Sequence, residues 1–167
     1  MKKIILLTMA MLLFHVSNGQ DAEVYFQRGN DKNKVSHFRQ AIAEYDKAIE
    51  LKPDYADAYL FRAMAKGDLG DNLGALIDYT TAIELNPQNA DGYNNRGNAK
   101  DDLGDHKGAV TDYDKALELN PKYTNAYYNR GLAKIRSGDK NGGCLDFSKA
   151  GELGLDRAYD SIKKHCR

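Results

Sequence analysis

Apolar and small residues recur along this chain with the spacing of amphipathic helices. In the stretch 90–123, Ala109, Tyr113 and Ala116 are separated by four and then three positions, which places them on one face of an α-helix. Tyr93 and Gly97 have the same spacing of four and share a face of a preceding helix. The pattern therefore predicts two helices that pack against each other through these faces.

The same pattern returns at a fixed period, in four consecutive copies without gaps. A tyrosine and a small residue mark the first helix of each copy, and a stripe of alanines and an aromatic residue marks the second. A glycine inside a helix costs about 1 kcal/mol relative to alanine, so its recurrence indicates that the two helices need a close approach. The copies are residues 22–55, 56–89, 90–123 and 124–157. A fixed period of this length is typical of a stacked-repeat architecture.

Turn and stop signals occupy fixed places in the copies. Leu-Gly-Asp at 69–71 and 103–105 and Ser-Gly-Asp at 137–139 combine a helix C-cap glycine with an N-cap aspartate. The first copy has Val-Ser-His at 35–37 instead, so a looser turn is expected there. Pro53, Pro87 and Pro121 share one phase and end the second helices. Leu51, Leu85 and Leu119, just before these prolines, are expected in the core.

The fourth copy is degenerate and is followed by one more predicted helix. Gly143 replaces the first alanine of the stripe, and Leu155 replaces the proline. Residues 156–166 carry the apolar residues Ala158, Tyr159 and Ile162 between polar ones. A stack of repeats needs such a terminal helix with a polar outer face, so this segment is predicted to be a cap.

The repeated unit resembles the tetratricopeptide repeat (TPR), a helix–turn–helix unit with the same period. In the third copy the matching residues are Tyr93, Gly97, Leu103, Gly104, Asp105, Ala109, Tyr113, Ala116, Leu119 and Pro121. The resemblance implies an all-α fold: a right-handed α-solenoid of four helix–turn–helix repeats and a C-terminal capping helix, in one domain over residues 20–167.

Residues 1–19 are predicted to be a signal peptide. Lys2 and Lys3 precede an apolar run from Ile4 to Val16, and Ser17 and Gly19 are small residues before a cut at Gln20. The alternative is a membrane anchor or a buried first helix, but the run is shorter than the roughly 20 residues needed to span a bilayer. We therefore expect an exported protein, periplasmic or secreted, that is not inserted in a membrane after the signal is removed.

Composition and motifs argue against several classes of function. The 24 basic and 24 acidic residues cancel, so nothing favours nucleic acid as a partner. No phosphate-binding loop, metalloprotease motif or nucleophile elbow occurs. We predict no enzyme activity, no cofactor and no metal site.

Charged residues also repeat with the period of the unit. Arg28, Arg62, Arg96 and Arg130 share one phase, and a lysine lies one helical turn after each of them. Glu44, Asp78, Asp112 and Asp146 recur on the second helices. One hypothesis is that each arginine pairs with an acid of its own or a neighbouring repeat. The alternative is two solvated rows of charge.

Cys144 and Cys166 are the two cysteines of the chain. The first lies on the second helix of repeat four, and the second lies at the end of the cap helix expected beside it. Export would permit oxidation, and a disulfide is the predicted state. A metal site with His165 and two separate thiols are the alternatives.

The TPR resemblance further implies a concave groove lined by fixed positions of the first helices. These positions vary between copies, as expected of a surface freed from packing. The implied groove residues are Phe26, Asn30, Asp57, Leu60, Met64, Asp68, Asp91, Asn94, Asn98, Asp101, Asp102, Asn125, Tyr128 and Leu132. The family's carboxylate clamp for acidic chaperone tails needs a lysine where this chain has Phe26, Leu60 and Asn94, so that activity is not expected.

The mixture of carboxamides and apolar side chains at these positions suits an extended peptide or a partner helix. The predicted function is therefore a non-catalytic module that binds a protein or peptide in the groove. One alternative is a structural subunit of an envelope assembly that uses the convex face or an edge. A thiol-based redox or metal protein and, more weakly, a binder of sugars are the others.

Overall fold

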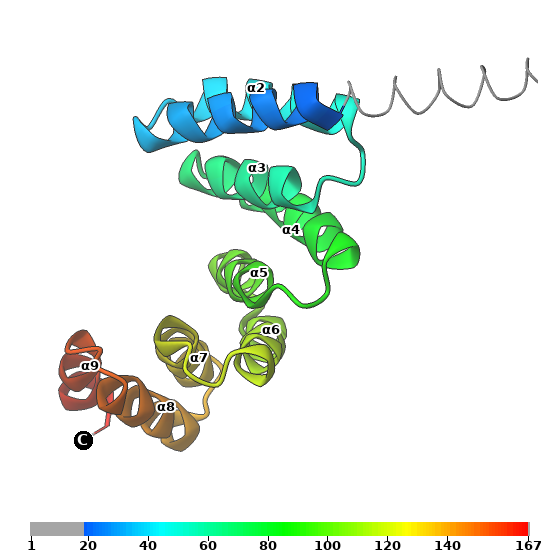
Figure 1. The fold of residues 1–167 in the computed structure, drawn as a ribbon. Helices are drawn as coiled ribbons and strands as arrows, with labels where there is room; N and C mark the ends of the chain where they lie inside the picture. Colours follow the sequence, from blue (N-terminus) through cyan, green and yellow to red (C-terminus); the bar gives the residue numbers. More distant parts are fainter. Residues whose placement is uncertain (1–18, 167) are drawn as a thin grey trace, which may run out of the picture.

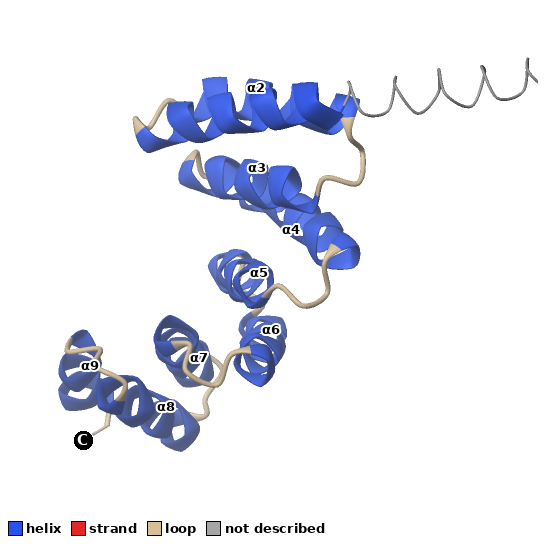
Figure 2. Ribbon diagram, in the orientation of Figure 1, coloured by secondary structure: helices blue, strands red, loops and turns tan. Residues whose placement is uncertain are grey.

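The structure, a computed structural model, describes residues 19–166, and its regular structure is helical throughout those residues (Figure 2). Apart from Gly19, the predicted signal peptide lies outside the described residues. Residues 19–34 are helical, which includes two residues before Asp21, where the apolar pattern begins. The helices that follow are α2 (Phe38–Leu51), α3 (Ala56–Asp68), α4 (Asn72–Leu85), α5 (Ala90–Asp102), α6 (His106–Leu119), α7 (Thr124–Arg136), α8 (Lys140–Glu152) and α9 (Arg157–His165).

The helices are stacked in the order of the chain. From α2 to α9, each helix packs against the next, and α3 also touches α5, as α5 touches α7. Figure 1 shows the result as an open arc, with α3, α5 and α7 on its hollow side and α4, α6 and α8 outside. Each predicted repeat from 56 onward corresponds to one helix pair. This arrangement confirms the predicted all-α solenoid of helix–turn–helix repeats with a terminal helix.

Small residues on the first helices admit the aromatic rings of the second helices. A Cβ atom added at Gly97 would lie 2.7 Å from the Tyr113 ring, and one added at Gly131 would lie 2.8 Å from the Phe147 ring. Tyr113 and Phe147 are among the largest fully buried side chains. Because interiors are close-packed, these glycines set the distance between the paired helices.

The turns between paired helices have the predicted caps. Gly70, Gly104 and Gly138 have φ of +81°, +86° and +95°, a region that glycine adopts without steric cost. The aspartates that follow each accept a hydrogen bond from a backbone N–H in the first turn of the next helix. The pairs are Asp71 with Gly74, Asp105 with Gly108 and Asp139 with Gly142, each at 2.9 Å.

The expected looser turn in repeat one is not observed. Ser36 adopts φ of +59° in place of a glycine. The His37 N–H donates to the Lys32 carbonyl at 2.9 Å, the same bond that Asp71 makes to Lys66. The turn therefore closes in the same way, and repeat one lacks only the side-chain cap, because His37 makes no such bond.

The second helices end as predicted in three repeats. α2, α4 and α6 end at Leu51, Leu85 and Leu119, each shortly before a proline. In repeat four, Gly154 has φ of +94° and the Leu155 N–H donates to the Ala150 carbonyl at 3.0 Å, which ends α8 without a proline. Placing Leu85 in the core was wrong: it is 40% exposed, because it lies on the last turn of α4.

The arginine–acid hypothesis is confirmed in repeats two to four. Arg62 donates to both carboxylate oxygens of Asp78, at 2.8 and 2.7 Å, and Lys66 reaches the same group at 2.7 Å. The same three-residue arrangement joins Arg96, Lys100 and Asp112, and Arg130, Lys134 and Asp146. Each of these three aspartates is buried. The repeated charges therefore hold the two helices of a repeat together.

Repeat one departs from this arrangement. Its acid is Glu44, whose Oε2 is buried without a hydrogen-bond partner. Arg28 lies over the Tyr25 ring at 5.4 Å and is exposed. For Arg28, therefore, the alternative interpretation of a solvated charge is the one that applies.

Among residues 19–166, no helix combines the length and the apolar character required to cross a membrane.

Candidate groove on the first helices

A cavity lies on the hollow side of the arc, against the first helix (residues 19–34), α3 and α5. Its volume is about 640 Å³. Six of its lining residues are among those predicted for the groove: Phe26, Asn30, Asp57, Leu60, Met64 and Asp91. Four were not predicted: Phe61, Asn89, Asn95 and Tyr123. Phe61 and Asn95 are the residues that follow predicted positions on the same helices, so a wider helical face would have found them.

Two smaller cavities follow, one lined by residues of α3, α4 and α5 and the other by residues of α5, α6 and α7. One, of about 210 Å³, is lined by the predicted Asp68, Asn98 and Asp102, and the other, of about 310 Å³, by Asn98, Asp101, Asp102 and Leu132. Sequence reasoning missed Asn129 and Arg136 in the second of these. The three cavities share residues, since Asn95 lines the first two and Asn98 the last two. The three cavities therefore adjoin one another, and they are called the groove below.

Three predicted groove residues lie elsewhere. Tyr128 accepts a hydrogen bond from the Ser161 hydroxyl at 3.2 Å and packs on Phe147, and Asn125 accepts one from Arg157 at 3.1 Å. Both therefore contact α9, of which Arg157 is the first residue, so the cap helix covers these two positions of α7. Asn94 is 4% exposed and is hydrogen-bonded to Asn95 at 3.1 Å. The cap helix and the packing around Asn94 therefore keep these three residues out of the open groove. The resemblance to the TPR family did not predict either effect.

Some of the predicted groove residues are packed in the core, although their positions vary between copies. Phe26, Leu60 and Asp101 are 7%, 6% and 8% exposed, although each lines a cavity. Phe26 belongs to the aromatic cluster of repeat one, with its ring centroid 5.4 Å from that of Phe61. These residues therefore form the floor of the groove and contribute to the core as well.

Two groove carboxamides are oriented by buried tyrosines. The Tyr45 hydroxyl donates to the Asn30 Oδ1, and the Tyr113 hydroxyl donates to the Asn98 Oδ1, both at 2.8 Å. Burial raises the pKa of Tyr45 to about 12, so this phenol stays protonated and remains a donor at neutral pH. With Oδ1 engaged, each carboxamide presents its N–H₂ group as a donor at the groove surface.

A buried acid lies at the C-terminal end of the groove. Asp101 pairs with His106, whose Nδ1 is 2.6 Å from Oδ1, and with Arg136 through Oδ2. These contacts join α5, α6 and α7. Arg136, the cation that lines this cavity, is therefore already bonded to a groove acid.

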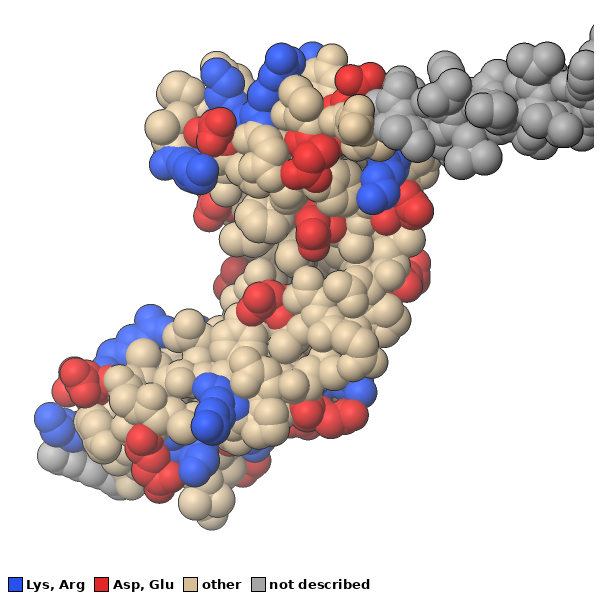
Figure 3. All heavy atoms as spheres, viewed as in Figure 1, with Lys and Arg blue, Asp and Glu red and all other residues tan. Residues whose placement is uncertain are grey.

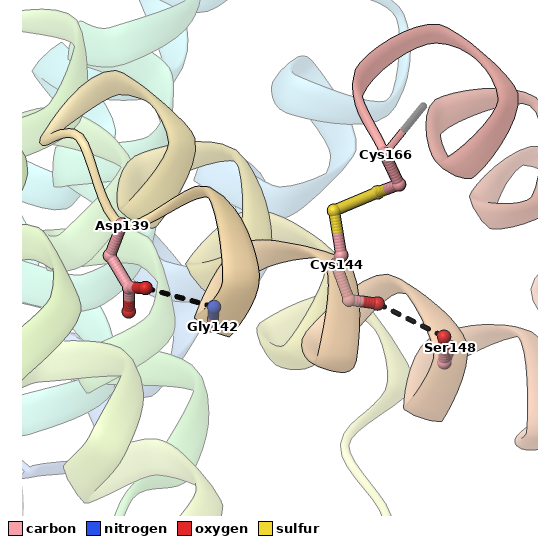
Figure 4. Close-up of a disulfide and its surroundings, with 5 residues drawn as sticks. All are labelled: Asp139, Gly142, Cys144, Ser148 and Cys166. Carbon is pink, nitrogen blue, oxygen red and sulfur yellow. Dashed lines mark hydrogen bonds between the residues drawn. A yellow bond between two sulfur atoms is a disulfide. The ribbon is translucent and has the colours of Figure 1, made fainter.

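The structure joins the two cysteines at the C-terminal end. The Cys144 and Cys166 sulfur atoms are 2.02 Å apart and the Cα atoms 5.8 Å, with α8 on one side and the end of α9 on the other (Figure 4). Cys166 also packs against the core cluster around Phe147. Within residues 19–166, no three His, Cys, Asp or Glu side chains are grouped so that they could hold a metal ion.

Comparison with known proteins places the chain in a family. A family model described as TPR repeat matches residues 63–100 and 102–138, and one described as tetratricopeptide repeat matches residues 22–55. No curated protein sequence matches the chain.

Several solved structures are similar to this fold. The TPR domain of Arabidopsis OM64 is 30% identical, with 71% of this chain and 98% of that one covered and a TM-score of 0.69. A crystal structure of MamA protein is 25% identical, with 86% and 80% covered and a TM-score of 0.80. The first TPR of Spaghetti (RPAP3), bound to the HSP90 peptide SRMEEVD, is 28% identical, with 70% and 93% covered and a TM-score of 0.69. The chain therefore belongs to the tetratricopeptide repeat family, whose fold is that of a protein–protein interaction module.

Proposed function

We propose that this protein is a non-catalytic interaction module that binds an extended segment of a partner protein in the groove on its first helices. The observation that carries the proposal is the orientation of Asn30 and Asn98 by tyrosines. A fixed carboxamide can donate to a peptide carbonyl without first losing rotational freedom, which reduces the entropic cost of binding. Apolar floor residues beside Asn30, such as Leu60 and Met64, would accept side chains of the same segment.

The similar structures support peptide binding as the way in which this protein recognises a partner, but they do not support the same peptide. The RPAP3 repeat binds a peptide with two adjacent glutamates and a C-terminal aspartate. Residues 26, 60 and 94 of this chain are Phe, Leu and Asn, and none of them is a cation that could pair with such a peptide. We therefore propose peptide binding in the groove with a different ligand.

The test compares one groove variant with one variant on the outer face. Asn95 lines the first two cavities, of about 640 and 210 Å³, and is only partly buried. Asn95→Arg should therefore block the groove without leaving a void in the core. Ile77 on α4 is 67% exposed, and Ile77→Arg adds the same charge there. Full-length protein and both variants are immobilised and exposed to an extract of the source cells, after circular dichroism shows equal helix content.

The expected result is a partner that is retained by the wild-type protein and by Ile77→Arg and lost by Asn95→Arg. Retention by all three proteins would place the interface outside the groove and overturn the proposal.

An assembly subunit that uses the outer face is the second candidate. Leu73 and Ile77, one turn apart on α4, are 64% and 67% exposed. Adjacent apolar side chains of this kind can mark a contact surface. In the same experiment, loss of the partner from Ile77→Arg alone would favour this candidate.

We also propose that the protein is exported and that the bond between Cys144 and Cys166 forms in it. The apolar run after Lys2 and Lys3 supports export, and the adjacency of the cysteines supports the bond. Intact mass of protein isolated from its source should correspond to a chain beginning at Gln20, lighter by two hydrogens than the reduced form. An uncleaved chain would argue against export, and two alkylatable thiols would reopen thiol chemistry.

A further inference from the structure

We propose that the 640 Å³ cavity binds the side chain of a lysine or arginine from an extended peptide segment, so that the ligand of the groove is cationic. This inference rests on the proposed groove function and specifies its ligand class.

The floor of the cavity suits the aliphatic part of such a side chain. Leu60, Met64 and Phe61 line it together with Phe26. Lysine and arginine bury their methylene stems against apolar surface and keep the charged end at a polar edge. The faces of aromatic rings also attract a cation through their quadrupole. The cavity therefore offers a surface that an ordinary apolar side chain would use only in part.

The charge at the edge of the cavity comes from two aspartates. Asp57 on α3 and Asp91 on α5 are exposed and line the same cavity. They occupy equivalent positions in repeats two and three, as Glu23 does in repeat one. A cation seated over the apolar floor would therefore have a carboxylate on each of two neighbouring helices.

Asp57 differs from its equivalents because no tyrosine hydroxyl bonds to it. The Tyr55 hydroxyl donates to Glu23, and the Tyr123 hydroxyl donates to Asp91 at 2.5 Å. The residue in that place for Asp57 is Asn89, which instead accepts from the Gly92 N–H at 3.0 Å and caps α5. Among residues 19–166, no side chain bonds to the Asp57 carboxylate, which leaves both oxygens for a ligand.

The rest of the groove is acidic on balance, since its one lining cation, Arg136, is bonded to Asp101. Asp68 and Asp102 line the second cavity, and Asp102 lines the third. The repeated cations Arg62, Lys66, Arg96 and Lys100 are bonded to Asp78 and Asp112 on the second helices. In the view of Figure 3, acidic side chains occur along the hollowed middle of the molecule. A chain of zero net charge therefore presents a groove with acidic walls, complementary to a basic segment.

The probe is a phage-displayed library of random nonapeptides, selected on the full-length protein. Selected sequences are synthesised with a fluorescent label, and each is also made with its basic residue replaced by glutamine. Binding is measured to the wild type, to Asp57→Asn, to Asp57→Asn/Asp91→Asn and to Asn95→Arg. Asp54→Asn is the matched control, because Asp54 is an exposed acid in the turn before α3 and lines none of the three groove cavities.

We expect selected peptides to carry lysine or arginine beside an apolar residue. Asp57→Asn should weaken them about fivefold, the double variant and the peptide glutamine substitution by more, and Asp54→Asn by less than about twofold. Affinity should also fall as salt is raised from about 0.05 to 0.5 M.

Two results would overturn the inference in distinguishable ways. Peptides that lack a cation, lose binding to Asn95→Arg and bind Asp57→Asn normally would leave the groove function standing and refute the cation site. Peptides that bind Asn95→Arg as well as the wild type, or the absence of any selected peptide, would refute the groove function and the cation site with it.

Discussion

Gly97 and its neighbour Asn98 both contact the side chain of Tyr113. The ring of Tyr113 packs against the space where Gly97 lacks a side chain, and its hydroxyl is held by Asn98. Repeat one has the same combination in Gly29, Asn30 and Tyr45. Repeat two has Ala63 followed by Met64, which offers the Tyr79 hydroxyl no comparable acceptor. Among the three repeats with a tyrosine at this place, the alanine therefore occurs in the one whose tyrosine hydroxyl is not bonded to the following residue.

This coupling predicts that Gly97→Ala destabilises the protein although alanine is the better helix former. The new Cβ would lie 2.7 Å from the ring, so Tyr113 must move and its bond to Asn98 must weaken. Overpacking of this kind costs about 1–3 kcal/mol, so over most of this range it outweighs the propensity gain of about 1 kcal/mol. Urea unfolding measures the difference.

Gly67→Ala is the control for Gly97→Ala. Gly67 is in α3, and a Cβ there meets no atom within 4 Å, so this variant should gain up to about 1 kcal/mol. Adding Asn98→Met to Gly97→Ala should reduce the cost, as in repeat two. Equal stabilisation by Gly97→Ala and Gly67→Ala would contradict the coupling.

At the scale of the helix, the first copy shows which part of a turn the sequence motif controls. The backbone of residues 32–37 closes as it does in the Gly-Asp turns, with Ser36 in the left-handed region. His37 has φ of −85° and ψ of 57°, close to the −83° and 69° of Asp71. The geometry needed for capping is therefore present, and the oxygen acceptor is missing.

His37→Asp should consequently stabilise α2 by about 1 kcal/mol. The carboxylate would accept from the Gln40 N–H, which in the structure donates to the His37 carbonyl at 3.0 Å, and would interact favourably with the helix dipole. Denaturant unfolding is the measurement, with Asp105→Ala as the opposite change, expected to cost about 1 kcal/mol. A His37→Asp protein no more stable than the wild type would show that the first turn of α2 is not limited by its cap.

At the scale of the molecule, each repeat contacts only its neighbours, so stability is close to a sum over repeats and interfaces. The C-terminal end depends on α9, a short helix that contributes Ala158 and Ile162 to the core cluster around Phe147 and whose end is joined to α8. Loss of that link should therefore act locally first.

Replacing both cysteines by serine should lower stability by about 3 kcal/mol in the chain-entropy model and loosen the last repeat before the others. Amide hydrogen exchange should show faster exchange in α8 and α9 with unchanged protection in α3 to α6. Exchange that rises uniformly, or stays unchanged everywhere, would contradict this prediction.

The sequence by itself determined the repeat, the helix pairs and their ends. These features depend on interactions within a single repeat, such as the Tyr113–Gly97 contact, the Asp105 cap and the proline after Leu119, and each is repeated, so one copy confirms another. The tertiary structure alone decided which groove positions stay open. Tyr128 and Asn125 contact the cap region, Asn94 is buried, and Asp57 keeps a free carboxylate because Asn89 caps α5. Such outcomes depend on contacts between successive repeats and with a unique terminal helix, which a repeated pattern does not encode.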